Sequence, residues 1–509
     1  MSLKKNIVFK SYTPNQVVML PPSLEELIEK NHPVRIVNQV IDKIDIDPLL
    51  KKFKGGGSSS YHPRMLLKVL VYGYLNNTYS SRRMESALKE NIHFMWLAGM
   101  NKPDHNTINR FRSDRLRDVL KTVFSQVVML LNEAGHLSLK DIYTDGTKIE
   151  AQANRYTFVW GNAIKTSKSR IEEQLKELWS YAEKIAADEL KDETPESFAP
   201  VSADQVRDTI DKIDQALEGK DISKKKRQQI NYAKKNWPAN IEKYTKQEET
   251  LGKRNSYSKT DQDATFMRMK EDHMKNGQLK PAYNVQMSSS NQFIVNYSLH
   301  QNPTDTTTLK SHLNTFHSLY TFYPAVLTAD AGYGSEENYA LLANRKIRAY
   351  VKHNQFDREQ RGKDKDWFKS DNLEYDKSRD IVYCPIGEPM KNIGTSIRRT
   401  ANGFKQTLTN YKALKCKGCP VRDVCHSQKG NRIVGINHRL RTLKGKANTL
   451  LISEEGVRHR KKRPADIEPV FANIKHNKNF KRFMLKGINK VEIETGLLAI
   501  AHNLGKLVA

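Results

Sequence analysis

The sequence has few cysteines and no long apolar run, and both absences narrow the class of protein. Only 4 cysteines occur in 509 residues, which argues against a disulfide-built domain and fits a reducing cytoplasm. The densest apolar run, Val127 to Leu131, is far shorter than the ~18 residues that a membrane-spanning helix needs. Basic residues open the chain, but Thr13, Asn15 and Gln16 interrupt the apolar residues that a signal peptide would need. We therefore expect neither export nor membrane insertion.

Acidic residues are also in deficit. The chain has 85 Lys and Arg but only 57 Asp and Glu, which gives a formal net charge of +28. An excess of this size favours a polyanionic partner, and nucleic acid is the commonest large one. Ribosomal, RNA-binding and membrane-surface proteins share this signature, so the charge alone selects only a class. A chain of 509 residues exceeds what one core usually supports, and we expect two or three domains.

Residues 1–135 read as a helical domain. After Pro63, which suits a first helical turn, one buried face is predicted by Leu66, Leu67, Leu70, Val71 and Tyr74. Further along, Asp104 can cap a short polar helix that follows the turn at Gly99. A basic helix after a glycine turn resembles the reading element of a helix-turn-helix. We expect DNA contacts from its exposed positions, which are Asn106, Asn109, Arg110 and Arg112.

Residues 161–259 are charged and predict a helical hairpin inserted into another domain. The apolar residues follow a four-three spacing typical of paired helices: Ile171, Leu175, Leu178, Ala182 and Ile185, then Val206, Ile210, Ile213 and Leu217. A turn lies between the two segments, and Ser202 with Gln205 has the form of a capping box. The lysine-rich stretch at residues 223–235 is most simply a solvated helix face.

Residues 136–160 and 260–355 predict a mixed sheet with helices on its faces. Residues 139–151 form a first strand, and residues 281–302 form two alternating runs joined by a serine-rich turn with Asn291, which indicates a hairpin. A helix, a buried strand, a second helix and a last strand then follow in residues 304–352.

Two acids at predicted strand ends suggest a metal site. Asp145 ends the first strand, and Asp330 ends a buried strand before Gly332 and Gly334 let the backbone turn away. If these strands are parallel neighbours, both acids lie at the carboxyl edge, where open sheets bind ligands. Facing carboxylates repel unless a cation lies between them, and oxygen ligands suit Mg²⁺ or Mn²⁺. Two such ions ~4 Å apart can activate water and stabilise the leaving oxygen of a phosphodiester.

A third acid is needed to hold the second ion, and Glu468 is the best candidate. Its helix has a predicted buried stripe of Ile467, Val470, Phe471 and Ile474, while Glu468 and Lys475 lie on one flank. Such a flank offers one group to metal and another to phosphate. Alternatives remain: Asp141 for Asp145, Glu492 or Glu494 for Glu468, and a supporting role for Asp261 and Asp263, which otherwise read as a helix start.

Three ordered blocks carry a family resemblance: "TDGTKIEAQANRYTFVW" from Thr144, "TADAGYGSEEN" from Thr328 and "IEPVFANIK" from Ile467. They resemble the catalytic blocks of DDE transposases of bacterial insertion sequences, and the N-terminal helical region resembles the domain that precedes those blocks. The resemblance runs from about Tyr61 to the C-terminus. It implies an RNase H-like α/β fold in which Asp145, Asp330 and Glu468 bind Mg²⁺ or Mn²⁺.

The resemblance also implies residues that contact DNA. Lys475 matches a lysine two turns after the glutamate in one large subgroup, and Tyr333 falls in the block around the second aspartate. The subgroup also has a tyrosine and an arginine before the glutamate, whereas here Lys461 and Pro464 hold those positions and Arg463 lies one place away. The residues expected on DNA in the catalytic region are Lys475, Arg463, Lys148 and Tyr333.

All four cysteines lie between Cys384 and Cys425, and Cys416 with Cys419 forms a CxxC turn. Such a turn places two sulfurs on one ion, and two further thiols complete a tetrahedral site, so structural Zn²⁺ is the sharper hypothesis. His426 could replace Cys425, and an iron–sulfur cluster or free thiols are the alternatives. We expect residues 356–455 to form an inserted lobe that touches DNA, and residues 456–509 to carry the catalytic helix.

The combined expectation is an enzyme that cuts double-stranded DNA at the terminal inverted repeats of its element and joins the ends to a target. We expect a homodimer when two ends are brought together, and a cytoplasmic protein associated with the bacterial nucleoid. The alternatives are a non-catalytic DNA-binding derivative and an RNase H-like nuclease that cuts without joining.

Overall fold

In the computed structural model of the chain, the described residues are 23–53, 60–190, 198–199, 202–269, 277–361 and 366–508. They fall into two compact units. Unit 1 comprises Met1–Arg115 with Leu504–Ala509, and unit 2 comprises Leu116–Asn503. None of the helices within these described ranges is both long and apolar enough to cross a bilayer.

Unit 1 is helical. Its elements are η1 (Leu24–Leu27), α1 (Pro33–Lys43), α2 (Asp47–Leu50), α3 (Pro63–Leu75), α4 (Ser81–Glu90), α5 (Ile92–Leu97), α6 (His105–Arg110) and the π turn η2 (Phe111–Arg115). Pro63 stands in the first turn of α3, where its missing N–H costs nothing, and the His62 side chain caps that helix. All five residues of the predicted α3 face are buried, which confirms this prediction.

The polar helix α6 begins as the sequence predicts. The Asp104 carboxylate accepts the Thr107 N–H at 2.7 Å, and Asn106, Asn109 and Arg110 are exposed. The expectation that Arg112 is exposed as well is wrong.

Arg112 is buried because the π turn η2 follows α6 and carries this side chain inward. Its guanidinium donates to the Tyr79 carbonyl oxygen at 2.8 Å and to the Tyr74 hydroxyl at 3.2 Å. Arg112 therefore ties η2 to the preceding helices and is not placed to reach DNA.

The main sheet of unit 2 has the strand order β4-β5-β1-β7-β8, with β6 also paired to β5. The strands are β1 (Asp141–Glu150), β4 (Thr265–Arg268), β5 (Leu279–Ser290), β6 (Phe293–His300), β7 (Val326–Ala329) and β8 (Arg348–Val351). β1, β7 and β8 run parallel, whereas β5 is antiparallel to β1, β4 and β6. The predicted hairpin is confirmed, because Asn291 and Gln292 adopt positive φ in the turn between β5 and β6.

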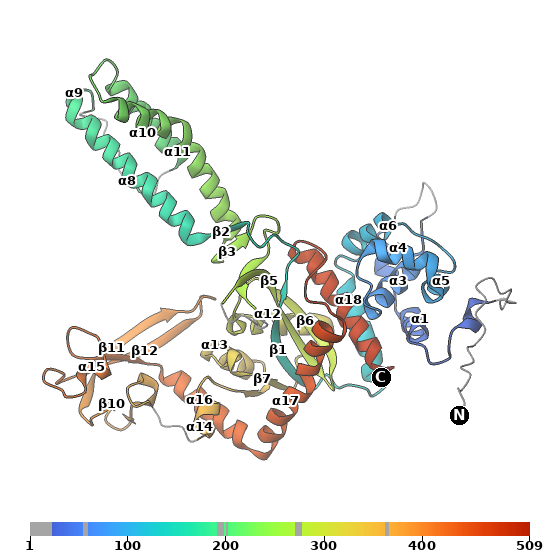
Figure 1. Cartoon of the computed structure of the whole chain (residues 1–509). Coiled ribbons are helices and arrows are strands. Elements are labelled where there is room, and N and C mark those ends of the chain that lie inside the picture. The colour runs from blue at the N-terminus through green and yellow to red at the C-terminus, as the bar shows by residue number, and fades with distance from the viewer. Residues whose placement is uncertain are drawn as a thin grey trace, which may run out of the picture. The chain divides into compact units, whose positions relative to one another are not determined.

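Helices cover both faces of this sheet (Figure 1). They are α7 (Leu120–Glu133), α12 (Leu309–Tyr320), α13 (Glu336–Asn344), α17 (Glu454–Ala472) and α18 (Ile488–Lys506). Neighbouring residues of β1 show the two layers. The Tyr143 hydroxyl lies 3.0 Å from His459 Nδ1 on α17, while Thr144 links through Ser288 to His312 on α12. The result is a curled mixed α/β sheet compatible with an RNase H-like fold.

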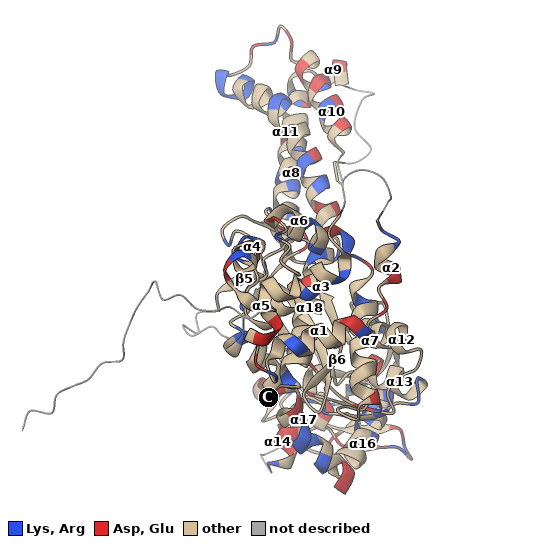
Figure 2. Cartoon of the chain, turned by 90° about the vertical axis from the view of Figure 1, so that its right-hand side faces the viewer, with Lys and Arg blue, Asp and Glu red and all other residues tan. Residues whose placement is uncertain are grey.

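The charged segment forms the predicted pair of helices and a third long helix, which begins in the lysine-rich stretch. They are α8 (Gly161–Ile185), α10 (Ala203–Ala216) and α11 (Lys224–Leu251), with the short α9 (Ala187–Leu190) between them. Ile171, Leu178, Val206 and Ile213 belong to their shared core, and the predicted capping box of Ser202 is present. The predicted turn lies mostly outside the described residues. The lysine-rich stretch begins α11 as a solvated face, and basic and acidic residues alternate along the ribbon of these helices (Figure 2).

Two short strands, β2 (Phe158–Trp160) and β3 (Ser256–Ser258), pair where the three helices leave and rejoin the sheet region.

The cysteine segment builds a separate antiparallel sheet of order β13-β12-β11-β10-β9. Its strands are β9 (Tyr375–Asp376), β10 (Ile381–Tyr383), β11 (Pro389–Arg399), β12 (Lys405–Ala413) and β13 (Ile433–Ile436). The remaining elements are η3 (Asp305–Thr307), η4 (Ala331–Tyr333), α14 (Phe356–Gln360), η5 (Ser370–Asn372), α15 (Arg422–Cys425), α16 (His438–Ile452) and the π turn η6 (Asn473–Asn477).

A buried polar network between α12 and the sheet makes stability depend on pH. His312 is fully buried, with Nε2 2.8 Å from Ser288 Oγ and Nδ1 2.8 Å from Ser298 Oγ. Burial lowers the pKa of His312 to about 3 and that of His300 to about 4. Both imidazoles are therefore neutral in the folded protein at any pH above about 4.

We predict that the free energy of unfolding decreases as the pH falls from about 6.5 to 4. Over this range the two histidine side chains become protonated in the unfolded chain but stay neutral in the folded protein. Each histidine contributes up to about 1.4 kcal/mol per pH unit. Urea unfolding at several pH values measures this slope. His312→Gln should flatten it, whereas His317→Gln, at an exposed position of the same helix, should leave it unchanged. Equal slopes in wild type and His312→Gln would contradict the prediction.

Candidate active site at the parallel edge of the sheet

Asp145 and Asp330 lie at equivalent positions on neighbouring strands. The parallel pairing of β1 with β7 ends at Thr144 and Ala329, so the two acids are the next residue of each strand. Gly146 N–H donates to Asp145 Oδ1 at 2.7 Å, and Gly332 N–H donates to Asp330 Oδ1 at 2.9 Å. The expected strand over residues 139–151 is confirmed, but Asp145 does not end it, because β1 continues to Glu150 along β5. Only β7, the parallel neighbour of β1, stops at this level, and its end exposes the edge of β1 at Asp145.

Glu468 reaches this edge through a shared cation. Arg463 and Glu468 both belong to α17, which packs against β1, β5 and β7. Arg463 Nη1 lies 3.2 Å from Asp145 Oδ2, and its Nη2 lies 3.9 Å from Glu468 Oε1. A guanidinium thus lies between a buried acid of the strand and an exposed acid of the helix.

A fourth acid, Asp305, lies beside the pair and was missed by the sequence reasoning. It begins η3, four residues of loop after the end of β6, and its Oδ1 accepts amide N–H groups from Asn284 and Gln286 at 2.8 Å each. A Cβ at Gly332 would lie 3.0 Å from Asp330 Oδ1 and 3.7 Å from Asp305 Oδ2, so the two carboxylates flank this glycine. Asp305 does not follow a strand directly, as Asp330 does, and its segment read as the start of a helix, so no local signal marked it.

Tyr333 lies beneath the acids. Its side chain is fully buried, and its hydroxyl donates to the Gln286 side-chain oxygen. Burial raises the Tyr333 pKa well above its usual value, and the nearby charges of Asp305, Asp145 and Asp330 add to this effect. The phenol therefore stays protonated and bonded to Gln286. The prediction that Tyr333 contacts DNA is wrong, because no part of its side chain faces solvent.

The end of α17 differs from the expected regular helix. Ile467, Val470 and Ile474 are buried as predicted, and Phe471 is half-buried. Lys475 is also buried, because the π turn η6 changes the angle between successive side chains, so it does not share the exposed flank of Glu468. The other predicted DNA contact, Lys148, is half-buried and donates to the Arg268 carbonyl oxygen at 3.0 Å.

The β5–β6 turn fixes α17 against the sheet. Asp466 Oδ1 accepts the Ser289 hydroxyl at 2.6 Å and the Gln292 N–H at 3.1 Å. The Gln292 side chain also donates to the Ala465 carbonyl oxygen at 2.9 Å. That carbonyl lies four residues before Pro469, which has no N–H to offer it.

The rival acids have other partners. Glu494 accepts the Met484 and Leu485 N–H groups at 2.9 and 2.8 Å, and Glu492 pairs with Lys121 at 2.6 Å. Asp261 and Asp263 do not begin a helix of their own, since they lie in the connection between β3 and β4. They accept the Gly487 and Ile488 N–H groups and so cap the start of α18. Asp141 is a half-buried first residue of β1 and lies four residues before Asp145.

The four cysteines line one small cavity of about 20 Å³, together with His426 and Arg432. All four are free thiols. Arg432 Nη1 donates to Cys425 Sγ at 3.0 Å, and Arg432 N–H donates to Cys416 Sγ at 3.4 Å. Over the described ranges, no group of three or more His, Cys, Asp or Glu side chains is gathered closely enough to hold a metal ion. Among those residues, neither the acids at the sheet edge nor the cysteines form such a group.

Two family models match the chain. One is described as "Transposase domain (DUF772)" and matches residues 22–114, which lie in unit 1. The other is described as "Transposase DDE domain" and matches residues 383–508, which include the four cysteines and Glu468. No curated protein and no solved structure matches the chain.

We predict that Gly146→Ala destabilises the protein by about 1–3 kcal/mol, the usual cost of overpacking. A Cβ at this position would lie 2.6 Å from Asp305 Oδ1 and would also collide with the Gln286 side chain. The matched control is Gly445→Ala in α16, where a Cβ meets nothing within 4 Å and should add about 1 kcal/mol of helix stability. Thermal unfolding should therefore move in opposite directions for the two variants, and a stabilised Gly146→Ala would refute the packing argument.

Proposed function

We propose that the chain is a DDE transposase of an insertion element, as the two transposase models that match it support, and that it cuts DNA at the ends of its element and transfers the freed ends into target DNA. Membership implies enzymatic action on DNA, with DNA as the partner. The observation that best supports the proposed site is the approach of Asp145 and Glu468 to one cation, Arg463, at the edge where Asp330 also lies.

The residues at this edge suit a divalent metal in their donor chemistry. Asp145, Asp330 and Glu468 offer only oxygen ligands, as Mg²⁺ and Mn²⁺ prefer. The guanidinium between Asp145 and Glu468 supports the idea that a positive charge is stable there. When bound, divalent ions lower the pKa of a coordinated water and stabilise charge on phosphodiester oxygens. Asp145, Asp330 and Glu468 would hold these ions.

The protein's own groups would orient the acids and the phosphate. The Gly146 and Gly332 N–H groups fix one oxygen of Asp145 and one of Asp330. Arg463 can bind phosphate oxygens through its planar fork, and its side chain is only 15% exposed, so it would meet only a phosphate that enters the site.

The proposed reaction has two steps that balance without an energy source. In the first, water attacks phosphorus at the element end, the bond to the 3′ oxygen breaks, and that oxygen leaves as a hydroxyl. In the second, the 3′ hydroxyl attacks a target phosphodiester, so one P–O bond forms as another breaks. Joining two ends requires two active sites, and we propose that a homodimer supplies them.

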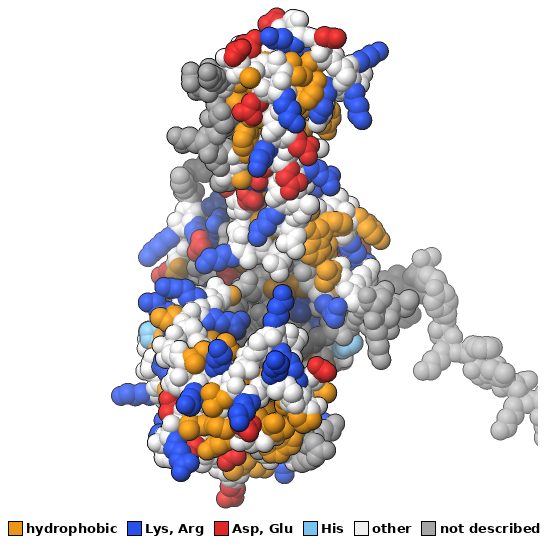
Figure 3. Space-filling model, turned by 90° about the vertical axis from the view of Figure 1, so that its left-hand side faces the viewer, with side chains coloured by type: hydrophobic (Ala, Val, Ile, Leu, Met, Phe, Trp, Pro, Cys, Tyr) orange, Lys and Arg blue, Asp and Glu red, His pale blue; other side chains and the backbone are white. Residues whose placement is uncertain are grey.

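The basic surface would supply most of the affinity for DNA. Lysine and arginine side chains spread over the lower part of the face drawn in Figure 3, where acidic side chains are few. In the cysteine sheet, the exposed outer part of β11 includes Arg398 and Arg399. In unit 1, α6 presents Asn106, Asn109 and Arg110, which we propose read the inverted repeats.

We predict that Asp145→Asn, Asp330→Asn and Glu468→Gln each reduce cleavage by more than roughly a hundredfold. Loss of an outer-shell partner of a metal already costs up to roughly a hundredfold, and loss of a ligand should cost more. Affinity for DNA should remain, because the basic surface is intact. The assay uses labelled element ends with Mg²⁺ and follows nicked and joined products. Chelation by EDTA should abolish both.

The control is Glu492→Gln, which removes an acid of the same chemistry whose partner is Lys121. It should cut and join as wild type does. Undiminished cutting by pure Asp145→Asn would refute the proposed triad. Nicked products without joined ones would favour the nuclease alternative, and binding without any product would favour the non-catalytic one.

We also propose that the cysteine lobe holds a structural Zn²⁺. Gly387 and Gly418, with φ of 85° and 77°, let the chain turn sharply after Cys384 and within the CxxC motif. Arg432 would give up its hydrogen bond to Cys425 so that the sulfurs could close on the ion. The small apolar core of this lobe gives a metal a clear stabilising role.

We predict about one zinc ion per chain by elemental analysis, because tetrahedral thiolate sites bind one ion. Cys419→Ser should remove the zinc and lower the thermal stability. Absorbance of an iron–sulfur cluster would identify that alternative. Four titratable thiols in a native, metal-free protein would contradict metal binding altogether.

A further inference from the structure

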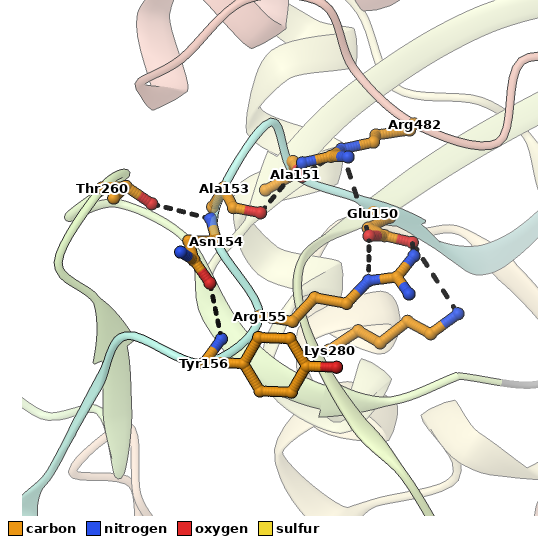
Figure 4. A network of polar contacts seen from close by, with 9 residues as sticks. All are labelled: Glu150, Ala151, Ala153, Asn154, Arg155, Tyr156, Thr260, Lys280 and Arg482. Carbon is orange, nitrogen blue, oxygen red and sulfur yellow. Dashed lines mark hydrogen bonds and ion pairs between the residues drawn. The ribbon is translucent and has the colours of Figure 1, made fainter.

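A cluster of three cations around one acid marks the far end of β1 (Figure 4). Glu150 accepts from Arg155 Nε and Nη2 at 2.8 and 3.0 Å, and lies 3.8 Å from Lys280 and 4.0 Å from Arg482. The Glu150 side chain is 9% exposed, whereas those of Arg155 and Arg482 are 42% and 43% exposed. The cluster therefore presents an excess of two positive charges to solvent.

The cations are held in place by contacts other than the ion pairs. Arg482 donates to the carbonyl oxygens of Ala151 and Ala153 at 3.1 and 2.9 Å. The chain around Arg482 is fixed in turn, because Phe483 N–H donates to the Glu150 carbonyl oxygen at 2.9 Å. Groups that are already ordered lose little conformational freedom when they bind an anion.

An exposed aromatic side chain follows directly. Tyr156 is 83% exposed, although its backbone is fixed by the Asn154 side chain, which accepts Tyr156 N–H at 2.8 Å. The Asn154 N–H donates to Thr260 Oγ1 at 2.8 Å, which anchors the turn. Phe158 is 47% exposed and packs edge-on against Phe266. A large aromatic exposed beside cations is the combination that binds single nucleic-acid strands, with phosphates on the cations and bases on the ring.

We propose that Arg155, Lys280 and Arg482 bind backbone phosphates of the DNA strand that enters the active site, and that Tyr156 stacks on an unpaired base of this strand. This inference rests on the proposed function. Glu150 lies five residues beyond Asp145 on the same strand, a separation of about 17 Å. At 3.4 Å per nucleotide along one strand, the contact falls about five nucleotides from the phosphate that is cut.

The test measures binding of the full-length protein to two labelled element ends. One is a full duplex, and the other has an unpaired base at the fifth nucleotide from the cleaved bond. Tyr156→Ala should weaken binding to the second DNA by about 5- to 100-fold. Tyr156→Phe should restore that affinity, because the ring remains. Lys280→Ala should reduce the slope of log affinity against log salt by about 1 for both DNAs.

The controls remove similar groups elsewhere in unit 2. Tyr232→Ala takes away a tyrosine of α11 that is 60% exposed, and Lys220→Ala takes away a lysine that pairs with Glu189 at 2.8 Å. Neither should change binding to the unpaired base or the salt slope. Circular dichroism confirms that each variant is folded.

Wild-type binding by Tyr156→Ala, in a protein that still cuts element ends, would overturn this inference and leave the proposed function standing. Wild-type protein that neither binds nor cuts these DNAs would overturn the proposed function itself. Competition by poly-glutamate as strong as that by DNA, with no effect of Tyr156→Ala, would indicate an acidic protein partner and would also overturn the inference.

Discussion

The site depends on a single constraint, the parallel register of β1 with β7. That register brings Asp145 and Asp330 side by side although 184 intervening residues separate them. Like charges so close are unfavourable without a counter-charge, and Arg463 on α17 supplies one. The sheet therefore fixes the positions of the two acids. Helix α17 supplies the positive charge that offsets their repulsion when no other cation is bound. Neither element alone explains the arrangement.

Much of the fold follows from local pattern. Helix α12 buries one face at a spacing of about 3.6 residues. The runs that predicted β5, β6 and β7 are buried on both faces, and their residue types and bounding turns indicated them instead. The failures have a common cause. Arg112 and Lys475 both lie in π turns, where one extra residue per turn rotates the side chains inward, and apolar spacing gives no sign of it. The lysine-rich start of α11 was expected as a solvated helix face, but its packing as the third member of the bundle was not, because polar residues dominate its composition.

The candidate site was only partly predictable for a different reason. Asp145, Asp330 and Glu468 could be chosen because each is an acid at a strand edge or on a helix flank. Asp305 could not, because its place depends on two amide side chains of β5 that are neighbours only after the sheet has formed. The same holds for Tyr333, which is fully buried and whose hydroxyl donates to Gln286 of β5, a residue distant in the sequence. In both cases the position of the side chain depends on partners that are distant in the sequence, and local pattern does not show such partners.

The proline at position 469 has a consequence for how α17 is held. An interior proline weakens an isolated helix, since it leaves a carbonyl four residues earlier without its usual donor. Here that carbonyl belongs to Ala465, and the Gln292 amide occupies it. The free carbonyl thus becomes the point where the β5–β6 hairpin binds α17. Helix α17 would be less regular on its own, and its contact with the hairpin holds it in place in the assembled domain. Glu468, the residue before this proline, would take up its place near Asp145 only after the sheet has been built.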